Sequence, residues 1–243
     1  CFILTGAAFF FAGLFKKVVL ADGIGAYAEP VFNDAASGAI IGTLDAWIAA
    51  FSFGFQIYFD FSGYSDMAIG LARIFGIKLP LNFASPYKAV NIIEFWRRWH
   101  ITLSSWIRDY LYIPLGGSRD GGRARQMAVM VGVMGLAGLW HGASWTFAIW
   151  GVAWAVVILL WRVLSPLVNA HPLVGWPYTY VMAVFLWVLF RAPDISYAAN
   201  YMLTMMGAGG AGTYAMPDSY VDQALIGAGC LALLLLHGLD RRL

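Results

Sequence analysis

His141 is the residue of this sequence whose type and position most favour chemistry. It lies in the run GLWHGA (residues 138–143), and no charged residue occurs between Arg125 and Arg162. An imidazole titrates near neutral pH, and surroundings that exclude water keep it neutral and able to accept a proton. Ionisable groups are costly inside membrane-spanning segments, so their presence there indicates function by default. His141 is therefore the first candidate for a general base.

A structural role for His141 stays open at this stage. A histidine in a membrane protein also serves to hydrogen-bond across helices, and Gly138 with Gly142 forms a small-xxx-small pattern that lets helices approach. His100, which directly follows Trp99, is the second candidate. Interfacial histidines beside tryptophans are often structural, so His100 alone carries less of the argument.

A third cluster, DFSGYSD (residues 60–66), places two carboxylates, two hydroxyls and a phenol in an otherwise apolar run. On a helix, Asp60 and Tyr64 are neighbours at i and i+4. The favoured interpretation is a polar cluster that joins helices, and a direct chemical role is the alternative.

Other catalytic patterns are missing from the sequence. It has no Cys/His metal spacing, no P-loop and no dinucleotide-binding glycine pattern. An intramembrane serine protease with Ser62 or Ser144 as nucleophile is conceivable. Neither serine lies in a Gly-x-Ser-x-Gly context, which disfavours that mechanism.

The composition indicates that membrane helices position these residues. Hydrophobic residues make up 61% of the 243 residues and charged residues only 12%, which is typical of a chain surrounded mostly by lipid. A spanning helix needs roughly 20 mostly apolar residues. Six runs approach that length: Phe2–Leu20, Leu44–Phe59 with a broken continuation to Phe75, Met127–Trp140, Ala143–Trp161, Tyr178–Phe190 and Val221–His237. We predict an all-α, multi-pass membrane protein and treat residues 1–243 as one integral domain.

The distribution of basic residues predicts the orientation. Between Arg73 and Arg125 there are nine basic residues against three acidic ones, so this stretch is expected to face the cytoplasm. The first helix has no clear charge asymmetry, and its orientation stays open. Within the basic stretch, Ile92–Tyr112 has helical periodicity that gathers tryptophans on one face, which predicts one interfacial or re-entrant amphipathic helix.

Four motifs resemble the membrane-bound O-acyltransferase family, and most of all its bacterial alginate O-acetyltransferase branch. They are DFSGYSD (60–66), FWRRWHITLSS (95–105), WIRDYLYIPLGGSR (106–119) and LWHGA (139–143). The motif-bearing core covers about residues 1–165. Family members typically have several helices before this part, so we expect the sequence to be a fragment without the N-terminal helices.

The resemblance implies a ring of tilted helices around a central tunnel, with His141 as the essential histidine and His100 as the second signature position. It also implies transfer of an acetyl group from a thioester, such as acetyl-coenzyme A, to an exported polysaccharide, with no permanently bound cofactor or metal. Binding of substrate or donor is expected from Trp96, Arg97, Arg98, Trp99, Ser104, Trp140, Asp60 and Tyr64.

The resemblance further implies a location in the bacterial inner membrane and a separate periplasmic acetyltransferase as partner. We expect no nucleic-acid partner. Arg97, Arg98, Arg119 and Arg123 would attract the phosphates of coenzyme A, although positive-inside anchoring explains the same charges. Two alternatives stay open: D-alanyl transfer to teichoic acid, and a non-catalytic component of polysaccharide export.

Overall fold

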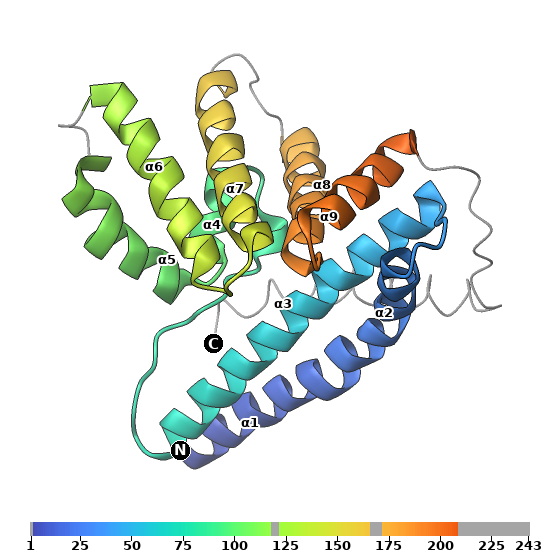
Figure 1. Cartoon of the computed structure of the whole chain (residues 1–243). Helices are drawn as coiled ribbons and strands as arrows, with labels where there is room; N and C mark the ends of the chain where they lie inside the picture. The colour runs from blue at the N-terminus through green and yellow to red at the C-terminus, as the bar shows by residue number, and fades with distance from the viewer. Residues whose placement is uncertain (1, 118–121, 166–171, 209–243) are drawn as a thin grey trace. The chain divides into compact units, whose positions relative to one another are not determined.

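A computed structural model describes residues 2–117, 122–165 and 172–208, and all regular secondary structure in these ranges is helical. The predicted all-α class is therefore confirmed. The chain forms two compact units, one made of residues 1–85 with 200–243 and the other of residues 86–199. Each unit is described by itself below, with helices labelled as in Figure 1. Two compact units can belong to one membrane domain, so this division does not test the prediction that residues 1–243 form a single integral domain.

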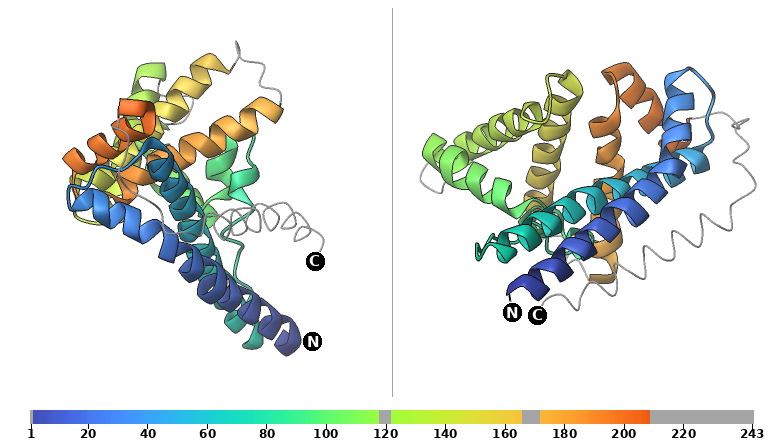
Figure 2. Two further views of the ribbon diagram at one scale, coloured as in Figure 1. Left: turned by 90° about the vertical axis from the view of Figure 1, so that its right-hand side faces the viewer. Right: turned by 90° about the horizontal axis from the view of Figure 1, so that it is seen from below.

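The first unit is built around two long helical rods. Helix α1 (Phe2–Phe15), the π-helix η1 (Lys16–Ala21) and α2 (Asp22–Ala36) follow one another without a break. Helix α3 (Thr43–Ile74) returns alongside α1, as Figures 1 and 2 both show. The sequence predicted a broken helix after Phe59, and this was wrong because the polar residues there have ion-pair partners on η1.

Paired glycines allow α1 and α3 to approach closely. A Cβ atom at Gly63 would lie 2.7 Å from the carbonyl oxygen of Gly13, and one at Gly70 would lie 2.5 Å from that of Gly6. Since carbon and oxygen cannot approach this closely without displacement, only glycine fits at both crossing points. Lipid does not drive helices together hydrophobically, so such close backbone contact is a main source of helix association in membranes.

Residues 201–208 pack against α2 and α3 of the same unit. They contain the end of α9 (Ile195–Leu203) and the π-helix η5 (Thr204–Ala208). The ring of Tyr201 stacks on Phe32 with 4.7 Å between centroids, and its hydroxyl donates to the Ala46 carbonyl. Trp47 donates its indole N–H to the Met205 carbonyl at 2.8 Å.

The second unit consists of short helices followed by longer ones. The short elements are η2 (Pro86–Lys88), α4 (Ile92–Arg98), α5 (Ile101–Ile107) and the π-helix η3 (Arg108–Gly117). The longer helices are α6 (Gly122–Leu139), α7 (Trp145–Leu164) and α8 (Pro172–Arg191). Helices α6 and α7 lie side by side in Figure 1, and Gly138 and Gly151 occupy their close contact.

Three helical stretches in the described ranges are long and apolar enough to cross a membrane: Phe2–Ala36, Trp145–Leu164 and Val174–Arg191. They contain the first, fourth and fifth of the predicted spans, except for Ala143 and Ser144 before α7. The predicted span Val221–His237 lies outside the described residues.

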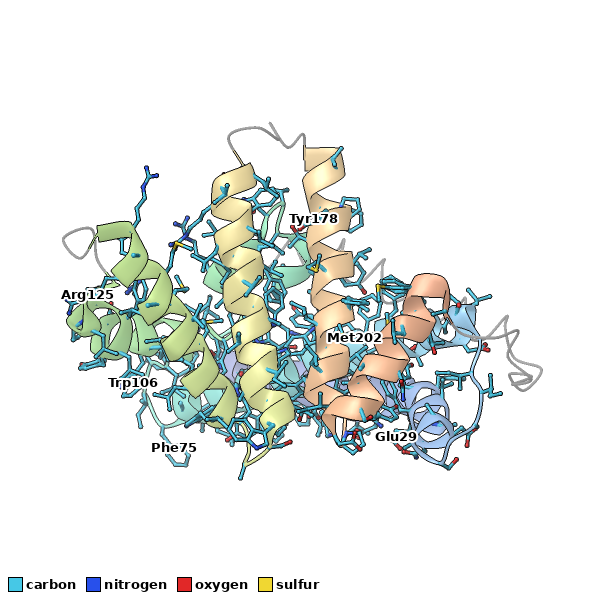
Figure 3. The ribbon with its side chains drawn as sticks, turned by 45° about the horizontal axis from the view of Figure 1, so that its top comes forward. Glu29, Phe75, Trp106, Arg125, Tyr178 and Met202 are labelled. Atoms are coloured by element: carbon cyan, nitrogen blue, oxygen red, sulfur yellow. The ribbon has the colours of Figure 1, made fainter. Side chains whose placement is uncertain are left out.

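The prediction of one amphipathic helix over Ile92–Tyr112 was wrong. Helix α4 ends at Arg98, and the backbone leaves helical geometry at Trp99 and His100 before α5 begins. The bend separates the tryptophans that the predicted helix placed on one face. Trp99 is buried, whereas Trp106, labelled in Figure 3, is 52% exposed.

Candidate functional site

His141 lies in the tight turn that joins α6 to α7, outside both helices. Its backbone N–H donates to the Gly138 carbonyl at 2.9 Å, which continues the hydrogen bonding of α6 beyond its end. Helix α7 begins after Ser144, whose hydroxyl oxygen caps it by accepting from the Thr146 N–H. A helix end and a capped helix start therefore hold His141 from both sides.

The imidazole of His141 has a defined tautomer. Its Nδ1 atom lies 2.8 Å from the Ala137 carbonyl oxygen. A carbonyl oxygen only accepts, so Nδ1 must carry the proton in this bond. In the neutral ring Nε2 then holds the lone pair, and Nε2 is the atom that can accept a proton.

Aromatic rings surround the imidazole of His141. Trp150 lies 5.2 Å away and Phe190 lies 5.3 Å away between ring centroids, both nearly perpendicular to the imidazole. Trp140 makes a similar edge contact at 5.2 Å, and Phe147 lies 6.4 Å away. These apolar walls lower the local dielectric and strengthen any polar interaction formed within them.

His100 is held in a strained backbone conformation between α4 and α5. Its φ and ψ angles are 44° and 56°, the left-handed region that non-glycine residues seldom occupy. Its ring contacts Trp140, with 6.4 Å between centroids. Strain of this kind persists only where surrounding packing imposes it, and it is often found at functional positions.

Both histidines are neutral at pH 7. Burial lowers the pKa of His100 to about 4, and the positive charge of protonated His141 adds to the effect. Burial also lowers the pKa of His141, although hydrogen bonds to the Ala137 and Gly138 carbonyls act in the opposite direction. The rings of both histidines contact Trp140, at 6.4 Å from His100 and 5.2 Å from His141 between centroids, so this indole links the two predicted residues.

The other predicted residues of this unit have different positions. Trp96 contacts Trp150, one of the rings around His141, whereas Trp99 is buried against Phe95 and Trp187. Ser104 donates its hydroxyl to the Trp99 carbonyl at 3.2 Å and so supports the bend. The exposed Trp140 contacts both histidines.

The predicted basic residues have uneven access to solvent. Arg98 is ion-paired with Glu94 one turn earlier on α4. Arg97 and Arg123 are exposed, and Arg119 lies outside the described residues. Exposed guanidinium groups at residues 97 and 123 can attract phosphate, whereas Arg98 is already neutralised.

Asp60 and Tyr64 belong to the other unit. Lys17 binds both Asp60 at 2.5 Å and Asp22 at 2.8 Å, while Tyr64 is exposed. Lys16 pairs with Asp66 in the same region. The acidic cluster thus joins η1 to α3, in accord with its structural interpretation, and its role in binding stays a prediction.

Sequence reasoning missed three groups around His141. Trp150 and Phe190 form its walls, and the Ala137 carbonyl sets its tautomer. Trp150 carried one weak signal, since it lies within ten residues of His141 on the next predicted span. Phe190 and the Ala137 carbonyl carried none, because an aromatic residue in an apolar helix and a backbone carbonyl are both ordinary.

We predict that His100→Gly is more stable than His100→Ala by about 1 kcal/mol. Both variants lose the same ring, but only alanine keeps the cost of a Cβ atom in left-handed geometry, which is about 1–2 kcal/mol. Chemical unfolding of both variants in the same detergent measures the difference. Equal stability would mean that residue 100 does not keep this backbone conformation.

The site combines a neutral imidazole of defined tautomer, a second neutral histidine and a wall of aromatic rings. This arrangement can remove a proton from a hydroxyl group. The model of the membrane-bound O-acyltransferase (MBOAT) family matches residues 3–204. The chain therefore belongs to this family, and the match extends well beyond the last motif recognised in the sequence.

Individual relatives carry acetyltransferase and D-alanyltransferase names. The chain is 43% identical to a peptidoglycan O-acetyltransferase of Helicobacter pylori, with 86% of this chain and 40% of the relative aligned. It is also 43% identical to a probable alginate O-acetylase AlgI of Pseudomonas aeruginosa, over 84% and 39% respectively. Identity to a teichoic acid D-alanyltransferase of Bacillus subtilis is 30%, over 64% and 40%. The chain spans about two fifths of the length of these relatives.

Proposed function

We propose that the protein containing this chain is a membrane O-acetyltransferase that modifies an exported polysaccharide. The donor is an acyl thioester, and the acceptor is a sugar hydroxyl. The observation that carries the proposal is the His141 imidazole, whose Nδ1 is bound to the Ala137 carbonyl and whose Nε2 can therefore take a proton. The acetyltransferase names of the relatives that are 43% identical support the acyl group.

In the proposed reaction, His141 Nε2 accepts the proton of the acceptor hydroxyl as its oxygen attacks the acyl carbon. The thiolate then leaves and takes up that proton, so the imidazole returns to its neutral form. Positioned base catalysis contributes about 10² to 10⁴ in rate. His100, which contacts the same Trp140 ring as His141, would orient the thioester. The exposed Arg97 and Arg123 would attract the phosphates of a coenzyme A donor.

We further propose that the protein is a multi-pass protein of the bacterial inner membrane. A separate periplasmic acetyltransferase would receive the acetyl group and complete the transfer to the polymer. The three apolar helical stretches support residence in a membrane. The proposal of a periplasmic partner rests only on the resemblance to the alginate O-acetyltransferase branch.

D-alanyl transfer is the second candidate, because relatives with that name match 58% and 64% of the chain. Their identity to the chain is lower, at 30% and 32%. A donor for that reaction would be a D-alanyl thioester on a carrier protein. The two candidates therefore differ in the thioester that the site accepts.

The test uses membranes that contain the full-length protein and its native polysaccharide. Radiolabelled acetyl-coenzyme A is supplied in one sample and a radiolabelled D-alanyl carrier protein in another. The proposal predicts label in the polysaccharide with the acetyl donor only. Label from the D-alanyl donor alone would assign the second candidate, and label from neither would leave an export component as the better account.

The pH dependence of acetyl transfer follows from the lowered pKa of His141. The neutral ring is the active form, so kcat/KM should fall as pH decreases through the lowered pKa, with a midpoint below the ordinary histidine value of 6.5. Initial rates with acetyl-coenzyme A between pH 4.5 and 8 give the profile. A midpoint above 6.5 would contradict a buried neutral base.

A further inference from the structure

Three tryptophans near His141 have buried indole nitrogens without a hydrogen-bond acceptor among the described residues. They are Trp96 of α4 and Trp150 and Trp154 of α7. A buried donor without an acceptor destabilises the folded state, so natural proteins seldom keep one without a reason. Three such donors in one ring cluster therefore require an explanation.

Packing alone gives only a partial explanation. The ring of Trp96 is nearly perpendicular to that of Trp154, with 5.1 Å between centroids, and is tilted by 65° from that of Trp150. Edge contacts of this kind let an N–H face an aromatic ring, which is a weak substitute for a carbonyl oxygen. The contact with Trp150 is also the longer of the two, at 6.0 Å.

Trp150 differs from the other two because its ring also contacts His141, at 5.2 Å. It is 2% exposed, so its N–H acts in surroundings that exclude water. An indole N–H only donates and does not ionise at physiological pH. The ligand atom that matches it next to a general base is an oxygen that gains negative charge during the reaction.

We propose that the Trp150 indole N–H is a catalytic hydrogen-bond donor to the acyl carbonyl oxygen of the thioester. This inference rests on the proposed acyl transfer and adds a residue to it. Catalytic hydrogen bonds of unliganded proteins often form only when substrate binds, which accounts for a donor without a protein partner.

The step balances as follows. The acceptor oxygen bonds to the acyl carbon, its proton moves to His141 Nε2, and the carbonyl electron pair moves onto the carbonyl oxygen. Trp150 donates to this oxyanion. When the pair returns, the carbon–sulfur bond breaks and the thiolate leaves with the bonding pair, then takes the proton from Nε2.

Trp150→Phe in the full-length protein tests the proposal, and Trp154→Phe is the matched control. Both residues lie on α7 one turn apart, both are almost fully buried, and both nitrogens lack an acceptor in the described ranges. We expect Trp150→Phe to lower kcat by about 10²-fold with little change in KM. Trp154→Phe should keep kcat within a few-fold of the native value, because its ring does not contact His141 and the substitution changes only packing.

A second variant separates loss of the N–H from loss of ring volume. In 3-benzothienylalanine, sulfur replaces the indole N–H while the ring keeps nearly the same shape. Placed at position 150, it should lower kcat as phenylalanine does. Native kcat in this variant would overturn the proposal and leave acetyl transfer intact, whereas absence of acetyl transfer by the native protein would refute the proposed function itself.

Discussion

Acetyl transfer by the full-length protein is expected to fall by about 10² to 10⁴-fold when His141 is replaced by alanine. The reason is geometric as well as chemical. The Ala137 carbonyl holds the ring through Nδ1, so the proton-accepting Nε2 has a set direction. Alanine removes this base and leaves only the contributions of positioning and electrostatic stabilisation. Initial rates in membranes with matched protein amounts measure the loss.

A glutamine at position 141 separates the catalytic role from a structural one. Its amide N–H can still donate to the Ala137 carbonyl, but the amide is not a base at neutral pH. If His141 served only to join the turn to α6, His141→Gln would retain most of the transfer. We expect His141→Gln to be as inactive as His141→Ala while unfolding closer to the native protein. Full activity in either variant would remove His141 as the base.

Some residues of the site could be predicted from the sequence and others could not. His141 was identifiable because it is an ionisable side chain in a long run without charge. Its nearest rings were not, since Trp150 and Phe190 look like any aromatic residues of an apolar helix. Their importance comes from ring contacts of about 5 Å formed by packing among α6, α7 and α8. Local sequence carries no information about such contacts.

The bend at His100 shows why local periodicity failed for the amphipathic segment. The run WRRWHITL contains neither glycine nor proline, so nothing in it predicts a helix end. Trp99 is instead buried between Phe95 and Trp187, with centroid distances of 5.7 Å and 4.9 Å. Tertiary burial of one tryptophan therefore outweighs the helical preference of the residues around it.

Tertiary contacts also explain helix α3, but here they allow a helix to continue where the sequence predicted a break. Its polar residues suggested an interruption, yet the helix continues from Thr43 to Ile74. Charge within an apolar helix is tolerated where a partner neutralises it. The partners, Lys16 and Lys17, are more than 40 residues away in the chain, as with the separation of 50 between Lys16 and Asp66. Ion pairs between residues this far apart in the sequence can be recognised only after the fold is known.

Removal of one partner of the Lys16–Asp66 pair is expected to be among the most destabilising single changes in the chain. The two side chains are 13% and 20% exposed, and their charged atoms lie 2.5 Å apart. In Asp66→Ala, the ammonium of Lys16 remains in an apolar helix without its carboxylate. Breaking a fully buried pair costs about 3–5 kcal/mol, and we expect a smaller cost for this partly buried pair. Chemical unfolding of the full-length protein in detergent measures the free energy.

The double variant Lys16→Met with Asp66→Leu shows whether Asp66→Ala destabilises the protein by leaving Lys16 without its partner or by removing side-chain volume. Two apolar side chains of similar size leave no buried charge, so we expect this variant to be clearly more stable than Asp66→Ala alone. Asp109→Ala, which breaks the exposed Arg108–Asp109 pair, should change stability little because water already solvates both groups. If Asp66→Ala changed the free energy of unfolding as little as Asp109→Ala, the Lys16 ammonium would have to be solvated by water without its carboxylate partner. The ion pair would then not be what allows α3 to continue through its polar segment.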